Sequence, residues 1–228
     1  MSLSFLNTNT TGRNASAAST HVANLASGGA NELLVVAYLA NDGGKHLLKP
    51  ATWDGEYHSA IGGDSMLGYL YKETDGGEGA TEAFTVSSTT DLVASASFRV
   101  TGHDVADPFN IDNRAEFLDA GDDVWTTSSG LLTGINNSDS NVLLLGGVEA
   151  VRSISTQDGD LTSVVSTLDG NSVHILRETG PGTSNKEYIN NMSGSQTFLT
   201  LLLEIKAAGG VPTLLQMKNY MRFNGVLL

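Results

Sequence analysis

The feature that most constrains this chain is a repeated alternation of short apolar runs and turn-forming clusters before Gly210. Runs rich in Val, Leu, Thr, Phe and Tyr are separated by clusters of Gly, Asn and Asp. This pattern is typical of antiparallel strands folded as a sandwich or a barrel. No apolar period of 3.6 residues lasts beyond a turn or two before the C-terminal segment. The sequence therefore predicts an all-β protein, a two-sheet antiparallel β-sandwich.

Individual segments predict how the strands face their surroundings. Glu32–Ala40 is a continuous apolar run, which indicates a strand buried on both faces. Ser65–Thr74 alternates, so its odd-numbered and even-numbered side chains are expected on opposite faces. Asp169-Gly170-Asn171 supplies the positive φ of a tight hairpin. Gly76–Gly79 lacks the Lys-Ser/Thr of a phosphate-binding loop, and it predicts a hairpin turn.

Two pairs of segments show weak internal sequence similarity, which we call the internal echo. Ala30–Ala40 is similar to Ser140–Ala150, and Ser95–Gly102 occupies a position similar to that of Thr200–Ala207. Two similar halves that together form one sandwich would explain the echo. The general sameness of buried strands explains it equally.

Charge and cysteine content narrow the classes of function. The 228 residues include 25 Asp or Glu, 12 Lys or Arg and no Cys, with a formal net charge of −13. This negative charge would repel the phosphates of nucleic acids and of anionic lipids, so neither nucleic acid nor an anionic membrane is an expected partner. Disulfides and thiolate metal sites are excluded. The first twenty residues do not follow the pattern of a signal peptide, and the apolar runs are far shorter than a membrane span of about 20 residues.

Six stretches in one order carry a resemblance to a known domain. They are NELLVVAYLANDGG, KPATWDGEYH, MLGYLYKETDGGEGATEAFTV, VASASFRVTGHDVADPF, SNVLLLGGVEA and FLTLLLEIKAA. This order resembles a jelly-roll-like β-sandwich domain of bacteriophage virion proteins and some bacterial surface proteins. The resemblance covers roughly Thr20–Ala208, with departures at Arg99 and at His103-Asp104. It implies a packing and attachment role, and it brings no catalytic residue and no cofactor.

The C-terminal segment Val211–Leu228 differs from the rest of the chain. It contains ten apolar residues, two basic residues and no acid, and it follows a Gly-Gly hinge. Exposed apolar groups at this density favour association, so we interpret the segment as an anchor on a partner or on a second copy. Folding back onto its own sandwich is the alternative. The docking candidates are Leu214, Leu215, Met217, Lys218, Tyr220, Met221, Arg222 and Phe223.

The N-terminal segment is a polar arm with one apolar plug, Phe5-Leu6, which is a candidate edge strand for a neighbouring sheet. The predicted organisation is therefore an N-terminal arm over residues 1–19, a β-sandwich domain over 20–208 and an anchoring tail over 209–228.

Residues that could carry chemistry give weaker signals. The five histidines are scattered and no Ser lies in a G-x-S-x-G motif, so an enzyme is not expected. His103 beside Asp104 is the most suggestive pair, and a solvated or turn-bonded His103 is the simpler interpretation. Candidates for stacking on a glycan are Trp53, Tyr57 and Trp125, for which structural packing is the alternative. Candidate calcium ligands are carboxylates clustered around glycines: Asp119, Asp122, Asp123, Asp158 and Asp160. Solvated surface turns are the alternative explanation for these clusters.

These observations together predict a structural component of a phage virion, assembled in the host cytoplasm. Its expected task is to decorate or reinforce the capsid through its terminal segments. The expected partners are the major capsid protein or tail proteins, with homo-oligomers in the particle. The alternatives are a tail-fibre or other tail-associated module, and a glycan-binding surface module.

Overall fold

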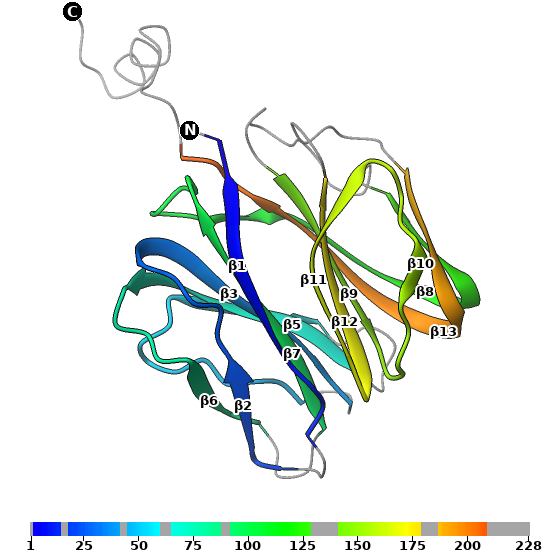
Figure 1. Cartoon of the computed structure of the whole chain (residues 1–228), viewed down its shortest axis with the longest axis horizontal. Helices are drawn as coiled ribbons and strands as arrows, with labels where there is room; N and C mark the ends of the chain where they lie inside the picture. Colours follow the sequence, from blue (N-terminus) through cyan, green and yellow to red (C-terminus); the bar gives the residue numbers. More distant parts are fainter. Residues whose placement is uncertain are drawn as a thin grey trace, which may run out of the picture.

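The computed structural model describes residues 2–14, 18–41, 45–59, 65–87, 92–128, 141–178 and 187–208. All regular structure in these residues is β-structure, and every strand pairing is antiparallel. No helix within these residues has the length and apolarity needed to cross a bilayer. The all-β, antiparallel prediction is confirmed (Figure 1).

The described strands form two large sheets and one small ribbon (Figure 1). Sheet I has the order β1 (Ser4–Thr11), β7 (Val93–Thr101), β3 (Ala30–Ala40), β5 (Met66–Asp75) and β4 (Gly55–Ser59). Sheet II has the order β10 (Ile154–Thr156), β13 (Glu187–Ile205), β9 (Asn141–Val148), β12 (Asn171–Glu178) and β11 (Leu161–Asp169), and β8 (Phe109–Ser128) also pairs with β13. The ribbon consists of β2 (Thr20–Asn24) and β6 (Thr81–Thr85).

The internal echo of the sequence coincides with a repeated arrangement of strands. In sheet I, β3 lies between β7 and β5, and in sheet II, β9 lies between β13 and β12. Sheet I comes from the N-terminal half of the chain and sheet II from the C-terminal half. Each half therefore builds one sheet around one apolar central strand, which supports the interpretation of two similar halves.

The main core lies between the facing surfaces of the two sheets. It takes the odd-numbered side chains of β3 and β5, such as Val35, Leu39 and Leu67, together with Leu145 and Leu201 of sheet II. Burying each such side chain contributes about 1.5–3 kcal/mol, so this cluster holds the sheets face to face. This packing is consistent with a β-sandwich.

Both outer surfaces of the sandwich are also covered, which explains why the central strands are apolar on both faces. The even-numbered side chains of β3, among them Leu34 and Tyr38, pack with Phe84 of the ribbon and with Trp53. Outside sheet II, Trp125 of β8 packs over the even-numbered side chains of β9 and β13. The predictions for Glu32–Ala40 and for the alternation in Ser65–Thr74 are therefore confirmed.

Turn predictions have mixed outcomes. The hairpin between β11 and β12 is confirmed, with Asp169 paired to Asn171 and a positive φ of 77° at Gly170. The hairpin predicted at Gly76–Gly79 is wrong, because β6 pairs with β2 and not with β5. This loop instead carries the chain from sheet I to the covering ribbon. Its turn chemistry was visible in the sequence, but the partner of the following strand was not.

Candidate functional site

The two ends of the described chain meet at one end of the sandwich, which we call the terminal pole. Ser4 pairs with Thr101, and the backbone of Ala207 bridges to His103. Ala208 N–H also donates to the carbonyl of Gly102 at 2.7 Å. Gly102 has a φ of 77°, and a Cβ there would lie 2.4 Å from the carbonyl oxygen of Ser2. Figure 1 shows the N-terminal strand and the end of β13 side by side at this pole.

A surface pocket of about 240 Å³ opens at the terminal pole. Asp54, Tyr71 and Glu73 line it from the edge of sheet I, and Leu33 of β3 also lines it. The loop between β7 and β8 supplies the remaining wall through Val105, Ala106 and Pro108. Strands β3 and β5, the residue before β4 and the β7–β8 loop therefore place two carboxylates beside an apolar rim.

His103 connects this loop to the wall of the pocket. Its Nε2 lies 2.6 Å from Glu73 Oε2, and the backbone N–H of Glu73 donates to Asp54 Oδ2 at 2.6 Å. His103 is buried and its Nδ1 has no hydrogen-bond partner, so no hydroxyl is bonded to the imidazole within the described chain. A nucleophile activated by this histidine would need such a contact. The simple prediction that His103 is solvated or turn-bonded is wrong, because Glu73 of β5 binds it.

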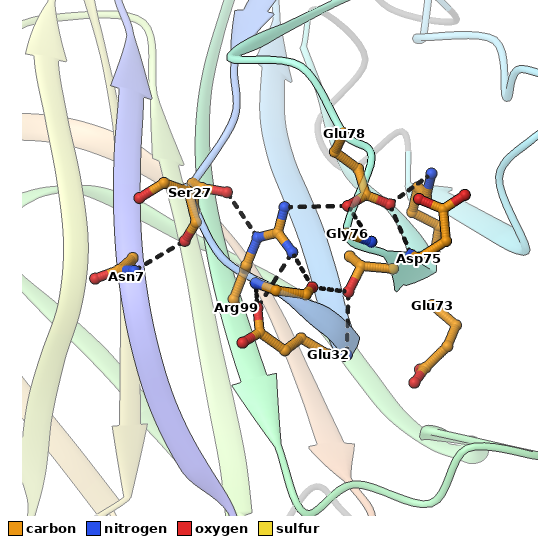
Figure 2. Close-up of polar contacts among 12 residues, drawn as sticks. Asn7, Ser27, Glu32, Glu73, Asp75, Gly76, Glu78 and Arg99 are labelled. Atoms are coloured by element: carbon orange, nitrogen blue, oxygen red, sulfur yellow. Dashed lines mark hydrogen bonds and ion pairs between the residues drawn. The ribbon is translucent and has the colours of Figure 1, made fainter.

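Arg99 is the centre of a polar cluster on the outer face of sheet I (Figure 2). Its side chain points to the outer face of sheet I, yet it is 2% exposed because the loops that contain Ala26, Gly29 and Glu78 cover it. Its Nε donates to the carbonyl of Ala26 at 2.7 Å and its Nη1 to that of Gly29 at 3.0 Å. Glu32 lies 3.2 Å from Nη1 and Glu78 lies 3.6 Å from Nη2.

Glu78 joins this cluster from the loop that follows β5. Lys72 Nζ lies 3.0 Å from its Oε1, and the N–H groups of Asp75 and Gly76 donate to its two oxygens. Burial alone would raise the pKa of Glu78, but the hydrogen bond from Lys72 and those from the backbone outweigh it and lower the pKa to about 2. The carboxylate is therefore ionised at neutral pH.

The Arg99 cluster fastens loops to the sheet and leaves little capacity for a ligand. The guanidinium already contacts two backbone carbonyls and two carboxylates. These contacts join β7 to the loop before β3 and to the loop after β5. A buried guanidinium with its donors engaged in this way is a structural clamp.

Two further histidines are buried with both ring nitrogens engaged. His21 contacts Asn14 Oδ1 at 3.0 Å and Ser95 Oγ at 2.8 Å. His174 contacts Ser166 Oγ and the carbonyl of Arg152, both at 2.9 Å. Burial lowers the pKa of each to about 4, although the hydrogen bond to Arg152 partly opposes this effect at His174. Both imidazoles are therefore neutral at pH 7 and hold strands together.

The structure separates the three aromatic glycan-stacking candidates. Trp53 is 2% exposed and packs edge-on against Phe84, with ring centroids 5.0 Å apart. Trp125 is fully buried against the outer face of sheet II and donates through Nε1 to Thr200 Oγ1 at 2.8 Å. Tyr57 is half-buried beside Tyr69. Neither indole presents a face to solvent, so the three side chains do not form a stacking platform.

The calcium candidates lie on two different segments of the described chain. Asp119, Asp122 and Asp123 belong to strand β8, not to the loop that the sequence suggested. Asp158 Oδ1 and Oδ2 accept from the N–H groups of Asp160 and Ile189. Among the described residues, no group of three or more His, Asp or Glu is placed to hold a metal ion.

The terminal docking candidates divide into described and undescribed residues. Ser4–Thr11, assigned from sequence to a separate arm, forms β1 and pairs with β7 of its own chain. Phe5 stacks on Phe98 at 5.8 Å between ring centroids, and Arg177 lies 4.7 Å above the Phe5 ring. Leu6 is 40% exposed. The remaining candidates lie outside the described residues: Leu214, Leu215, Met217, Lys218, Tyr220, Met221, Arg222 and Phe223.

Sequence reasoning did not find the pocket or the Arg99 cluster. A signal for the cluster existed, because an arginine interrupts an otherwise apolar or small-residue strand after Phe98. No comparable signal links Asp54 and Glu73 to the loop after His103. Comparison of the chain with protein-family models, curated proteins and solved structures finds no match.

Proposed function

We propose that this chain is a structural component of a phage virion that decorates or reinforces the capsid shell. In this proposal, the sandwich is jelly-roll-like and acts as a rigid body, and segments at its terminal pole attach it to the particle. The observation that carries the proposal is the meeting of both ends of the described chain at that pole, where Ser4 pairs with Thr101 and Ala207 bridges to His103.

One shared pole suits attachment through terminal segments. Residues 209–228 follow directly from Ala208, which is hydrogen-bonded to Gly102 at the pole. A segment that leaves there and docks on a neighbour would orient the sandwich with its opposite end outward. The opposite pole contains the end of β3 at Ala40, the turn at Gly170 and the exposed Val151.

The way the chain uses its buried polar groups supports a structural role. Arg99 clamps two loops, and His21 and His174 join strands through both ring nitrogens. Satisfied buried polar networks rigidify a fold and specify one arrangement. These groups are engaged in holding the sandwich together, which fits a building block whose task is attachment.

The phage context comes from the resemblance of the strand motifs. The same resemblance fits a tail-fibre or other tail-associated module, so position on the particle is the alternative to test. The glycan-binding alternative gains no support from the site, because Trp53 and Trp125 are buried.

Quantitative mass spectrometry of purified particles tests the proposal. Copies of this chain are counted against those of the major capsid protein, with labelled peptides as standards. Hundreds of copies per particle are expected for a shell decoration, and a handful indicates a tail position. Absence of the chain from purified particles contradicts the proposal.

A truncation tests the role of the terminal segment. Deleting Val211–Leu228 is expected to leave a folded monomer that no longer joins the particle, because the last described strand ends at Ile205. Circular dichroism and size-exclusion chromatography check the fold, and particle pull-down checks attachment. A truncated chain that still joins the particle contradicts the proposed anchor, and one that unfolds shows that the segment belongs to the core.

A further inference from the structure

The charged side chains that line the pocket at the terminal pole are both acidic. Asp54 and Glu73 both line it, and no Lys or Arg does. Asp54 uses Oδ2 to accept the Glu73 N–H, and Glu73 uses Oε2 to contact His103. Asp54 Oδ1 and Glu73 Oε1 therefore remain as acceptors without a hydrogen bond from the described residues. A cationic donor group is the complement of this arrangement.

The rim of the pocket suits the aliphatic part of a long basic side chain. Val105 is 65% exposed, and Ala106 and Pro108 continue the same loop wall. Long basic side chains pack their methylene groups on apolar surface while the charged group reaches its partner. The volume of about 240 Å³ also fits one side chain better than a drug-sized ligand, whose pockets measure roughly 300–1,000 Å³.

The aromatic ring of the pocket argues against a sugar as the ligand. Gly55 packs so closely on Tyr71 that an added Cβ would lie 2.3–2.4 Å from its Cε1, Cζ and hydroxyl oxygen. Phe109 meets the Tyr71 ring nearly edge-on, with centroids 4.9 Å apart. With its ring engaged by Gly55 and Phe109, Tyr71 is a poor stacking platform for a pyranose.

We propose that this pocket binds the guanidinium of an arginine presented by a partner protein at the terminal pole. A planar guanidinium has five donors and reaches two separate acceptors, and it is more weakly hydrated than an ammonium. Asp54 Oδ1 and Glu73 Oε1 accept its N–H groups, and the loop wall receives its methylene stem. The source of the arginine rests on the proposed attachment role, whereas the binding chemistry belongs to the isolated chain.

Amide NMR titration of the full chain with N-acetyl-L-arginine amide tests this inference. Saturable shifts are expected at Asp54, Tyr71, Val105 and Ala106, with a Kd in the millimolar range because one side chain forms few contacts. N-acetyl-citrulline amide is the neutral isostere, and it is expected to give no saturable shifts. N-acetyl-lysine amide is expected to bind more weakly than the arginine probe.

Matched variants locate the binding. Asp54→Asn and Glu73→Gln each remove one charge from the pocket and are expected to weaken arginine binding about tenfold. Asp123→Asn removes the same charge at an exposed position of β8 and is expected to leave it unchanged. Asn at position 54 can still accept the Glu73 N–H, so this variant keeps the test usable if Glu73→Gln does not fold.

Several results would overturn the inference. The inference is wrong if the arginine probe gives no saturable shift, or if the citrulline probe binds equally well. It is also wrong if both pocket variants bind arginine as tightly as the unmodified chain. The same holds if calcium chloride or methyl glucoside shifts the same amides instead. If the arginine probe does not bind but the chain joins particles normally, only the inference about the pocket is refuted. Arginine binding by a chain that never joins particles refutes only the proposed virion role.

Discussion

Replacing Arg99 with methionine removes the central cation of the clamp while keeping a long apolar stem. The side chain is 2% exposed and lies between Glu32 and Glu78, each of which it contacts directly. The variant leaves the carbonyls of Ala26 and Gly29 without their guanidinium donor. It therefore tests whether a charged residue on a sheet surface holds the surrounding loops in place.

The expected magnitude follows from these contacts. Removing one partner of a buried ion pair costs about 3–5 kcal/mol, because the remaining charge stays buried without compensation. Glu78 keeps Lys72 and two backbone donors, and Glu32 is 14% exposed, so we expect the lower part of this range, about 3 kcal/mol. Arg99→Lys keeps the charge but loses the fork geometry, and it should cost about half as much.

Urea unfolding followed by circular dichroism measures these differences as shifts of the midpoint at constant m value. Arg152→Met is the matched control, because the hydrogen bonds that the Arg152 guanidinium makes to described residues go to the carbonyls of Val151 and Ser195. We expect this control to lose less than about 1 kcal/mol. An Arg99→Met protein within about 1 kcal/mol of wild type would show that the clamp does not stabilise the fold.

Three further outcomes are expected. Because the folded pKa of His21 and His174 is about 4 against 6.5, unfolding free energy falls as pH drops from 6.5 towards 4, by roughly 3 kcal/mol per histidine. His174→Gln should make that slope shallower in urea titrations across pH, and an unchanged slope refutes the assignment. Gly146→Ala places a Cβ 2.4 Å from Trp125 and should lower the unfolding free energy by about 1–3 kcal/mol, whereas Gly159→Ala has open space and should not. Weak acrylamide quenching of tryptophan fluorescence should follow from the burial of both indoles, and strong quenching contradicts it.

Sequence patterning predicted the parts of the fold that depend on local order. The continuous apolar run of β3 was readable because both of its faces are buried, one in the inter-sheet core and one under the ribbon. The β11–β12 turn was readable because Gly170 requires a positive φ. The similarity of β3 to β9 was visible because both are central strands that demand the same apolar composition.

The remaining features depend on contacts between distant segments. The loop at Gly76–Gly79 has ordinary turn chemistry, and only the pairing of β6 with β2 shows that it connects two layers. Likewise, Glu73 meets His103 across 30 residues of sequence, and Arg99 reaches Gly29 across 70. Carboxylates are so common in this chain that their sequence positions alone do not identify the few that converge on a basic partner.

Hydroxyl-radical footprinting of free and particle-bound protein tests the central claim most directly. Val105 at the terminal pole is 65% exposed and Val151 at the opposite pole is 51% exposed, so both are open to oxidation in the free chain. Attachment through the terminal pole predicts that Val105 becomes protected in the particle while Val151 stays reactive. Protection of Val151 with Val105 unchanged would contradict the account.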